Sequence, residues 1–151
     1  MNAVSVRSTR FSAQDTAILL LRVSLGVMFL AHSVLLKLMT FGLPGTAAFF
    51  VGVGLPGWLA YATFAAEAIG GALLLLGVQA RWVALALSPV MLGALAWVHA
   101  ANGWVFTSPN GGWEYPLYLF VLCVAQFLLG DGPYALSRSR LPAFATPVLT
   151  R

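Results

Sequence analysis

Charged residues are scarce in this chain of 151 residues, where lysine, arginine, aspartate and glutamate together make up 8%. A soluble domain carries about 25% charged residues, because charged side chains keep its surface in water. Hydrophobic residues account for 60% of the chain, and the mean hydropathy is +0.90. The composition therefore argues against a soluble helical bundle. It indicates a membrane protein of one domain, with most of its length in lipid.

Cysteine is nearly absent as well, since Cys123 is the single one. One thiol cannot run a dithiol and disulfide cycle within the chain, so redox chemistry would require a cofactor or a partner. The alternating pattern of a transmembrane β-barrel is also missing. The net charge of +4 forms no basic stripe beside exposed aromatic residues, which argues against a nucleic-acid partner. A helical membrane protein remains.

Four apolar runs predict helices that cross the bilayer, which takes about 20 residues. The last run is shorter, and tilt or local thinning accommodates it. The predicted fold class is therefore all-α, a four-helix transmembrane bundle. A short apolar piece, residues 46–51, is expected to lie along the interface in the first outer loop, where it can act as a lid. The four runs are residues 15–38, 58–78, 82–101 and 115–129.

Basic residues gather at one side of the predicted bundle, with Lys37 alone on the other side. The positive-inside rule then places both termini in the cytoplasm, and the first run is expected to be an uncleaved signal anchor. Residues 1–14 would form a cytoplasmic N-terminal segment, 15–130 the membrane domain and 131–151 a cytoplasmic tail. The arginines counted are Arg7, Arg10, Arg22, Arg81, Arg138, Arg140 and Arg151.

Glu67 lies in the middle of the second apolar run, where a carboxylate costs several kcal/mol unless another group pairs with or solvates it. At 1.5 Å per residue it lies about 13 Å below the outer boundary. The same topology places His32, Lys37, His99 and Glu114 in the outer half of the bundle. We predict that these polar side chains meet in one shared recess.

Helical spacing indicates which faces point inward. Glu67 shares its side of the second helix with Gly70 and Gly71, small residues that let membrane helices approach closely. The inward stripe of the first helix holds Arg22, Gly26, Phe29, Ser33 and Lys37.

Two further features concern the later helices. Glu114 and Tyr118 fall on one face of the fourth helix. Pro89 is expected to kink the third helix and to free a backbone carbonyl for a ligand or water.

The order of these features resembles the DoxX family of small bacterial membrane proteins, over about residues 15–137. One departure is Leu136-Ser137-Arg138, where many members close with Ser-Leu-Asp, so any role of that last carboxylate is not carried over. The matching elements are Arg22 with Lys37, Glu67 followed by Gly70, Gly71 and the turn from Gly77 to Arg81, Asn110-Gly111-Gly112-Trp113-Glu114, and Gly132-Pro133 before Leu136-Ser137.

The resemblance implies a place in the bacterial cytoplasmic (inner) membrane and a link to membrane redox systems. Members of the family include a thiosulfate:quinone oxidoreductase subunit and components of complexes with enzymes that detoxify oxidants and thiols. The resemblance carries Arg22, Lys37, Glu67 and Glu114 over as functional positions. It does not fix their chemistry.

A quinone suits the predicted recess, because its ring fits an apolar, aromatic pocket. His32 or His99 could hydrogen-bond a quinone carbonyl, and Glu67 could relay a proton as the catalytic group. Haem held by the two histidines is a second possibility. No metal site is predicted, since no pair has the spacing of a known metal motif. The cofactor-binding candidates are Arg22, His32, Lys37, His99, Glu114 and Tyr118.

A structural interpretation stands beside the functional one. Glu67 could form an ion pair with Lys37 or Arg22 that fixes helix register, and each histidine could bond a backbone carbonyl. The chain would then be a non-catalytic anchor or assembly subunit for a redox-enzyme partner. It would lie in a lipid bilayer and could form an oligomer. A carrier or proton path is disfavoured, because the inner half holds only Arg22 and Gln126 as polar groups.

Overall fold

The computed structural model of the protein describes residues 12–140, and the regular elements in this range are helices. A capping box between Ser12 and Asp15 begins the first helix. Val78 and Ser137 pair in an isolated β-bridge. The elements are α1 (Ala13–Leu30), which continues as the π-helical segment η1 (Ala31–Thr40), α2 (Leu43–Gly52), α3 (Trp58–Leu76), α4 (Ala80–Gly93), which continues as the π-helical segment η2 (Ala94–His99) and the 3-10 turn η3 (Ala100–Asn102), and α5 (Glu114–Leu129).

Three helical stretches in the described range are long and apolar enough to cross a membrane: Ala13–Thr40, Trp58–Leu76 and Ala80–Asn102. They match the first three predicted spans to within a few residues, so the prediction of an all-α membrane bundle is confirmed. α5 is also apolar, but its 16 residues extend about 24 Å, less than the roughly 30 Å of a bilayer core. A fourth crossing by α5 stays a prediction.

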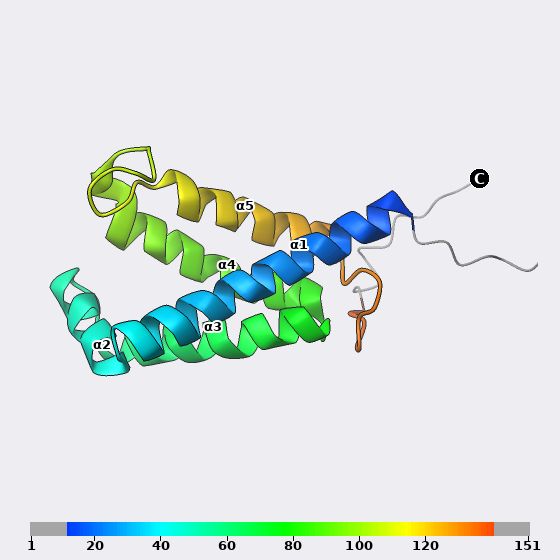
Figure 1. Ribbon diagram of the computed structural model, residues 1–151, viewed down its shortest axis with the longest axis horizontal. Coiled ribbons are helices and arrows are strands. Elements are labelled where there is room, and N and C mark those ends of the chain that lie inside the picture. The colour runs from blue at the N-terminus through cyan, green and yellow to red at the C-terminus, as the bar shows by residue number, and fades with distance from the viewer. Residues whose placement is uncertain (1–11, 141–151) are drawn as a thin grey trace, which may run out of the picture.

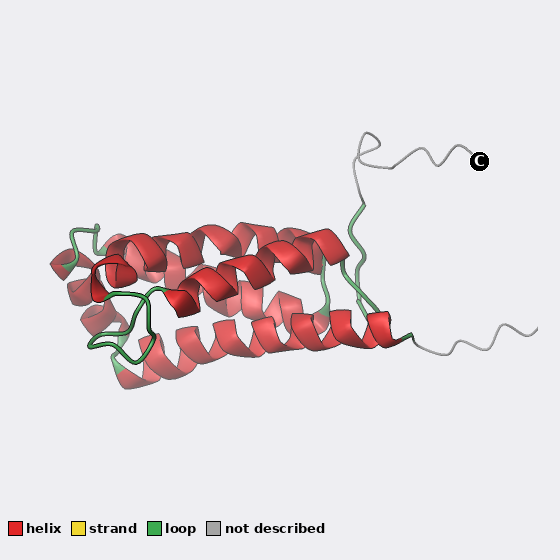
Figure 2. Ribbon diagram, turned by 90° about the horizontal axis from the view of Figure 1, so that it is seen from above, coloured by secondary structure: helices red, strands yellow, loops and turns green. Residues whose placement is uncertain are grey.

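The helices form two closely packed pairs, α1 with α3 and α4 with α5 (Figures 1 and 2). The pairs meet at the end of the bundle where residues 12 and 140 lie, which we call the terminal end. They diverge towards the opposite end, which α2 covers and which we call the α2 end (Figure 1). A hollow between the pairs is therefore expected at the α2 end.

α2 is the short helix predicted in the first loop, and it is longer than the apolar piece 46–51 that suggested it. Gly42, with φ of +69°, makes the turn that precedes it, a conformation that only glycine adopts readily. The Thr46 hydroxyl donates to the carbonyls of Gly42 and Lys37, at 3.0 and 3.3 Å. These bonds attach α2 to the end of η1.

Glycines bring the helices into backbone contact. A Cβ atom added at Gly26 of α1 would lie 2.9 Å from the Gly71 carbonyl of α3, and one added at Gly70 would lie 2.8 Å from the Leu87 side chain of α4. Gly70 and Gly71 therefore face two different neighbours. The predicted inward faces are buried at Arg22, Gly26 and Phe29 of α1, at Ser33 of η1 and at Glu67, Gly70 and Gly71 of α3. Lys37, the last residue of the predicted stripe, is half-buried.

Pro89 lies inside α4, and its missing N–H leaves the Leu85 carbonyl without its usual helical partner. The Ser88 hydroxyl donates to that carbonyl at 2.8 Å. The carbonyl is thus satisfied within the helix, rather than left for a ligand or water as the sequence suggested.

We predict that Gly26→Ala lowers the free energy of unfolding by about 1–3 kcal/mol, because its new methyl group overpacks the α1 and α3 contact. Gly93→Ala is the matched control, since a Cβ atom at Gly93 meets nothing within 4 Å. It should leave stability unchanged or raise it by up to about 1 kcal/mol through helix propensity. Thermal unfolding of both variants in detergent tests this, and equal losses would contradict it.

Candidate functional site

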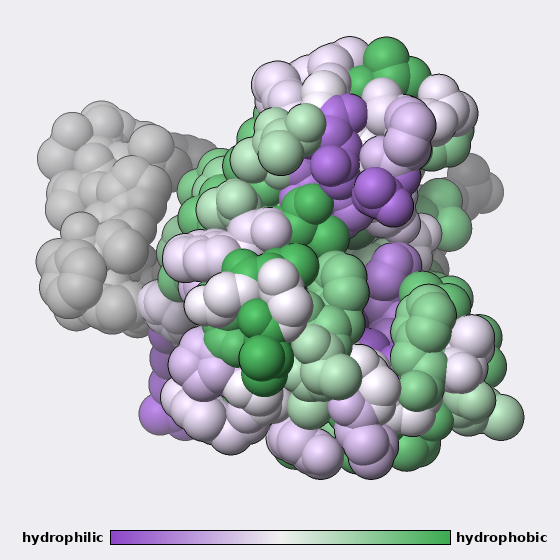
Figure 3. Space-filling view, turned by 90° about the vertical axis from the view of Figure 1, so that its left-hand side faces the viewer, coloured by the Kyte–Doolittle hydropathy of each residue, from purple (hydrophilic) through white to green (hydrophobic). Residues whose placement is uncertain are grey.

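A cavity of about 930 Å³ lies at the α2 end, between the two helix pairs. Its wall comes from α1, η1, α2, α3, α4, η2 and α5 and is mostly apolar. Seen from this end, hydrophilic surface lies in a recess between more hydrophobic side chains (Figure 3). The polar side chains in the wall are His32, Lys37, Thr46, Thr63, Glu67, His99 and Tyr115.

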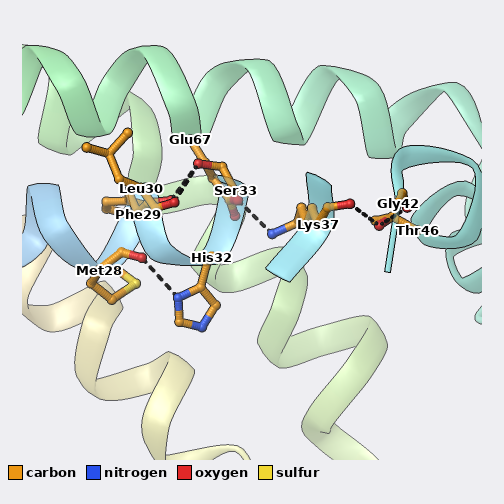
Figure 4. Close-up of polar contacts among 9 residues, drawn as sticks. All are labelled: Met28, Phe29, Leu30, His32, Ser33, Lys37, Gly42, Thr46 and Glu67. Carbon is orange, nitrogen blue, oxygen red and sulfur yellow. Dashed lines mark hydrogen bonds and ion pairs between the residues drawn. The ribbon is translucent and has the colours of Figure 1, made fainter. Parts of the chain in front are cut away.

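An ion pair between Lys37 and Glu67 is the charged part of this wall (Figure 4). The Lys37 Nζ atom donates to Glu67 Oε2 at 2.6 Å, and the pair joins η1 to α3. The Glu67 side chain is 3% exposed and the Lys37 side chain 16% exposed. The pairing is what allows a carboxylate to remain this far from water.

His32 is held in one orientation by its own helix. Its Nδ1 atom lies 3.0 Å from the Met28 carbonyl oxygen (Figure 4). A carbonyl oxygen can only accept, so Nδ1 carries the proton, and Nε2 of the neutral ring is an acceptor. The ring stacks beside Tyr115 of α5, with centroids 6.3 Å apart.

His99 is fixed in the same way by the loop that follows η3. Its Nδ1 atom lies 2.9 Å from the Gly111 carbonyl oxygen and must donate to it. Asn102 donates to the same carbonyl at 3.0 Å and to the Val98 carbonyl at 3.1 Å. Two elements of the α2 end, η1 and η2, thus each present an imidazole whose Nδ1 atom is bonded to a backbone carbonyl. In the neutral ring, Nε2 is then an acceptor that a ligand can use.

Three predicted binding residues do not line this cavity. The Glu114 carboxylate turns back and accepts from the Phe106 N–H at 2.8 Å, which closes the loop before α5. Tyr118 is 60% exposed on α5, and Arg22 is buried at the terminal end. The structure therefore gathers Glu67, Lys37, His32 and His99 from the predicted set. Binding roles for Arg22, Glu114 and Tyr118 stay predictions that the cavity does not support.

Thr63 and Tyr115 belong to the cavity wall but were not among the candidates from the sequence. Thr63 lies one helical turn before Glu67, so the spacing of α3 could have found it. Tyr115 opens α5 directly after Glu114. Among residues 12–140, no group of three or more His, Cys, Asp or Glu side chains could hold a metal ion.

Asp131 organises a second polar cluster, at the terminal end, which the sequence analysis missed. Its carbonyl accepts from Arg22 at 2.6 Å, and its carboxylate accepts from the Arg81 N–H and from both the N–H and the hydroxyl of Ser139. Ser137 also bonds Gly77 and Gln79 through the backbone. The first part of the predicted tail is therefore attached to α1 and α4. Residues 1–11 and 141–151, which the predicted terminal segments include, lie outside the described range.

We predict that Lys37→Met lowers the free energy of unfolding by about 3–5 kcal/mol, because Glu67 is then buried without its cation. The double variant Lys37→Met with Glu67→Gln should recover most of this loss, since no unpaired charge remains. Unfolding measurements in detergent on both single variants and the double variant give the coupling between the two groups. Additive losses would contradict the importance of the pair.

Stability should also depend on Asp131 at acid pH. Burial raises the pKa of this carboxyl, but the hydrogen bonds from Arg81 and Ser139 outweigh it and bring the pKa below its ordinary value. A depressed pKa in the folded state contributes stability above the unfolded pKa of about 3.9, and this is lost as the pH falls through the folded pKa. Asp131→Asn should therefore be less stable at pH 7 and should lose less on acidification to pH 3. Thermal unfolding across this range measures both, with Ser139→Ala expected to be intermediate.

Comparison with known proteins identifies relatives of this chain. The relative named "Putative oxidoreductase CatD" from Bacillus subtilis (strain 168) is 40% identical over 77 residues, which is 51% of this chain and 55% of the relative. The chain thus spans about half of the length of that relative. No solved structure matches the chain significantly. The sequence model of the DoxX family matches residues 17–100, which include most of α1 and all of η1, α2, α3, α4 and η2. Lys37 and Glu67 both lie within this match. The chain belongs to the DoxX family.

Proposed function

We propose that this protein is the membrane subunit of a redox system and binds a quinone, or a small molecule of similar shape, in the cavity at the α2 end. The supporting observation is the cavity itself. It holds about 930 Å³ between apolar walls, with a buried ion pair and two oriented imidazoles. Small-molecule sites commonly have this size and this combination of apolar wall and few polar groups.

The polar groups suit a ring that exchanges protons. Reduction of a quinone to a quinol takes up two electrons and two protons. The electrons would come from a partner redox enzyme, because the chain has no dithiol of its own. Glu67 is the group proposed to exchange one of these two protons with the ligand, and Lys37 holds its carboxyl group in the cavity wall.

A second, smaller cavity of about 490 Å³ supports a ligand that arrives through the lipid. It lies between α1 and α5 and shares Met28, His32 and Tyr115 with the main cavity. Its wall also includes Val27, which is 54% exposed on the outside of α1. A membrane-dissolved ring could pass between these helices to reach His32.

The same proposal includes the orientation. Arg22 and Arg81 belong to the terminal end, with the cluster around Asp131, whereas Lys37 belongs to the α2 end. The positive-inside rule then favours a cytoplasmic terminal end and a periplasmic α2 end, in a bacterial inner membrane.

A non-catalytic anchor or assembly subunit is the second candidate. The observation that favours it is that the Lys37 and Glu67 pair and the Asp131 cluster each hold separate elements together. In that case, Glu67→Gln should impair accumulation or complex assembly. In a ligand-binding subunit, the same variant should accumulate normally and lose ligand binding.

We predict that Ala94→Trp weakens quinone binding, because Ala94 lines the cavity and the indole would take up part of the space that the ring needs. Ala96→Trp is the matched control, since Ala96 lies on the same segment, is exposed and does not line the cavity. Quinone is extracted from both variants after purification in mild detergent. The amount should fall at least tenfold in Ala94→Trp, which corresponds to a loss of about 1.4 kcal/mol in binding free energy, and should not change in Ala96→Trp.

Two results would contradict the proposal. One is wild-type protein that neither retains a quinone nor binds an added one. The other is Ala94→Trp protein that inserts normally and binds as wild type does. Equal losses in Ala94→Trp and Ala96→Trp would point to disturbed folding of η2, which unfolding curves of the two variants would reveal.

A further inference from the structure

We infer that the cavity binds the reduced, hydroxyl-bearing form of its ring ligand, an aromatic diol such as a quinol, more tightly than the oxidised quinone. This inference rests on the proposed function and concerns the chemical form of the ligand. It follows from the direction of the hydrogen bonds that the wall can make.

The two histidines supply acceptors. The Nδ1–H group of His32 donates to the Met28 carbonyl, and that of His99 donates to the Gly111 carbonyl. In a neutral ring, these bonds place the proton on Nδ1 and leave a lone pair on each Nε2 atom. Glu67 adds a third acceptor, because Lys37 bonds Oε2 and no hydrogen bond to Oε1 occurs within residues 12–140.

The wall also contains donors, and they do not separate the two ligand forms. Lys37 can donate a further ammonium proton, and the hydroxyls of Thr63 and Tyr115 can donate or accept. A quinol hydroxyl can accept from each of these groups, just as a quinone carbonyl can. The donors therefore serve either form of the ring.

The acceptors do separate the two forms. A quinol hydroxyl can donate to an imidazole Nε2 while it accepts from Lys37. A quinone carbonyl has no proton to donate, so a bound quinone would cover the acceptors of His32 and His99 without pairing them. A buried acceptor that loses water and gains no partner opposes binding, by about 3-fold to 10-fold in affinity for each ordinary hydrogen bond.

The expected result is a quinol that binds at least about 10-fold more tightly than its quinone. By linkage, this preference makes the bound ring easier to reduce than the free ring. A tenfold difference corresponds to a rise of about 30 mV in the midpoint potential of a two-electron couple.

The experiment titrates the purified full-length protein in mild detergent at pH 8, without oxygen, with three probes. Decylubiquinone has two ring carbonyls, decylubiquinol has two hydroxyls, and the di-O-methyl ether of decylubiquinol has the same ring without a donor. Tryptophan fluorescence quenching or calorimetry gives each dissociation constant. The quinol should bind at least about 10-fold more tightly than the quinone and the ether.

Variants of His32 connect the preference to its nitrogen. The amide of His32→Asn can still donate to the Met28 carbonyl, but it leaves no acceptor at the Nε2 position. Quinol affinity should fall by about 3-fold to 10-fold, while quinone affinity changes little. Tyr61→Phe is the control, since it removes a hydroxyl from α3 at a residue that does not line the cavity. It should change neither affinity.

The outcomes separate the proposed function from the preference for the reduced ring. If none of the probes binds, the proposed function fails. If the quinone binds as tightly as the quinol, or the ether matches the quinol, the present inference is overturned while the proposed function survives. If His32→Asn weakens quinone and quinol equally, the preference does not come from this acceptor, and the inference is overturned in the same way.

Discussion

The need to neutralise one buried carboxylate governs the α2 end of this protein. Glu67 is nearly inaccessible, and its partner must come from another helix because α3 carries no cation near it. Lys37 fills that role from η1, so the last turns of the first crossing stay beside α3. The bond from Thr46 to the Lys37 carbonyl then holds α2 over the same region. The charged pair, the covering helix and the cavity are therefore parts of one arrangement.

Close packing and open space are divided along the length of the bundle. Gly26 and Gly71 bring α1 against α3, and Gly70 admits Leu87 from α4. These contacts lie beyond Glu67 in the direction of the terminal end. On the other side of Glu67, two π-helical segments, η1 and η2, form the cavity wall with α2 and α5. Such segments often mark functional sites, because their wider turns displace side chains from ordinary helical positions.

The sequence predicted what depends on hydrophobicity and regular helical spacing. Three crossings, the short helix and the buried stripe through Arg22 and Phe29 follow from these patterns alone. The pairing of Glu67 with Lys37 was foreseeable because the membrane offers few other cations. The orientation of Glu114 was not, because a hydrogen bond to Phe106 within the loop competes with the cavity. Asp131 was missed since its partners are mainly backbone groups, which no sequence pattern displays.

The attachment of residues 131–139 to α1 and α4 has a mechanical consequence. It joins the two helix pairs at the terminal end, while the ribbons of the pairs diverge towards the α2 end (Figure 1). The two helix pairs are then joined at Asp131, which we take as the pivot, and are separated by the cavity at the α2 end. The first crossing has 28 residues and is about 42 Å long, so a swing of about 5° at the pivot displaces its far tip by about 4 Å. A small change of angle beside Arg22 and Arg81 would thus produce a larger change in the width of the cavity at the α2 end.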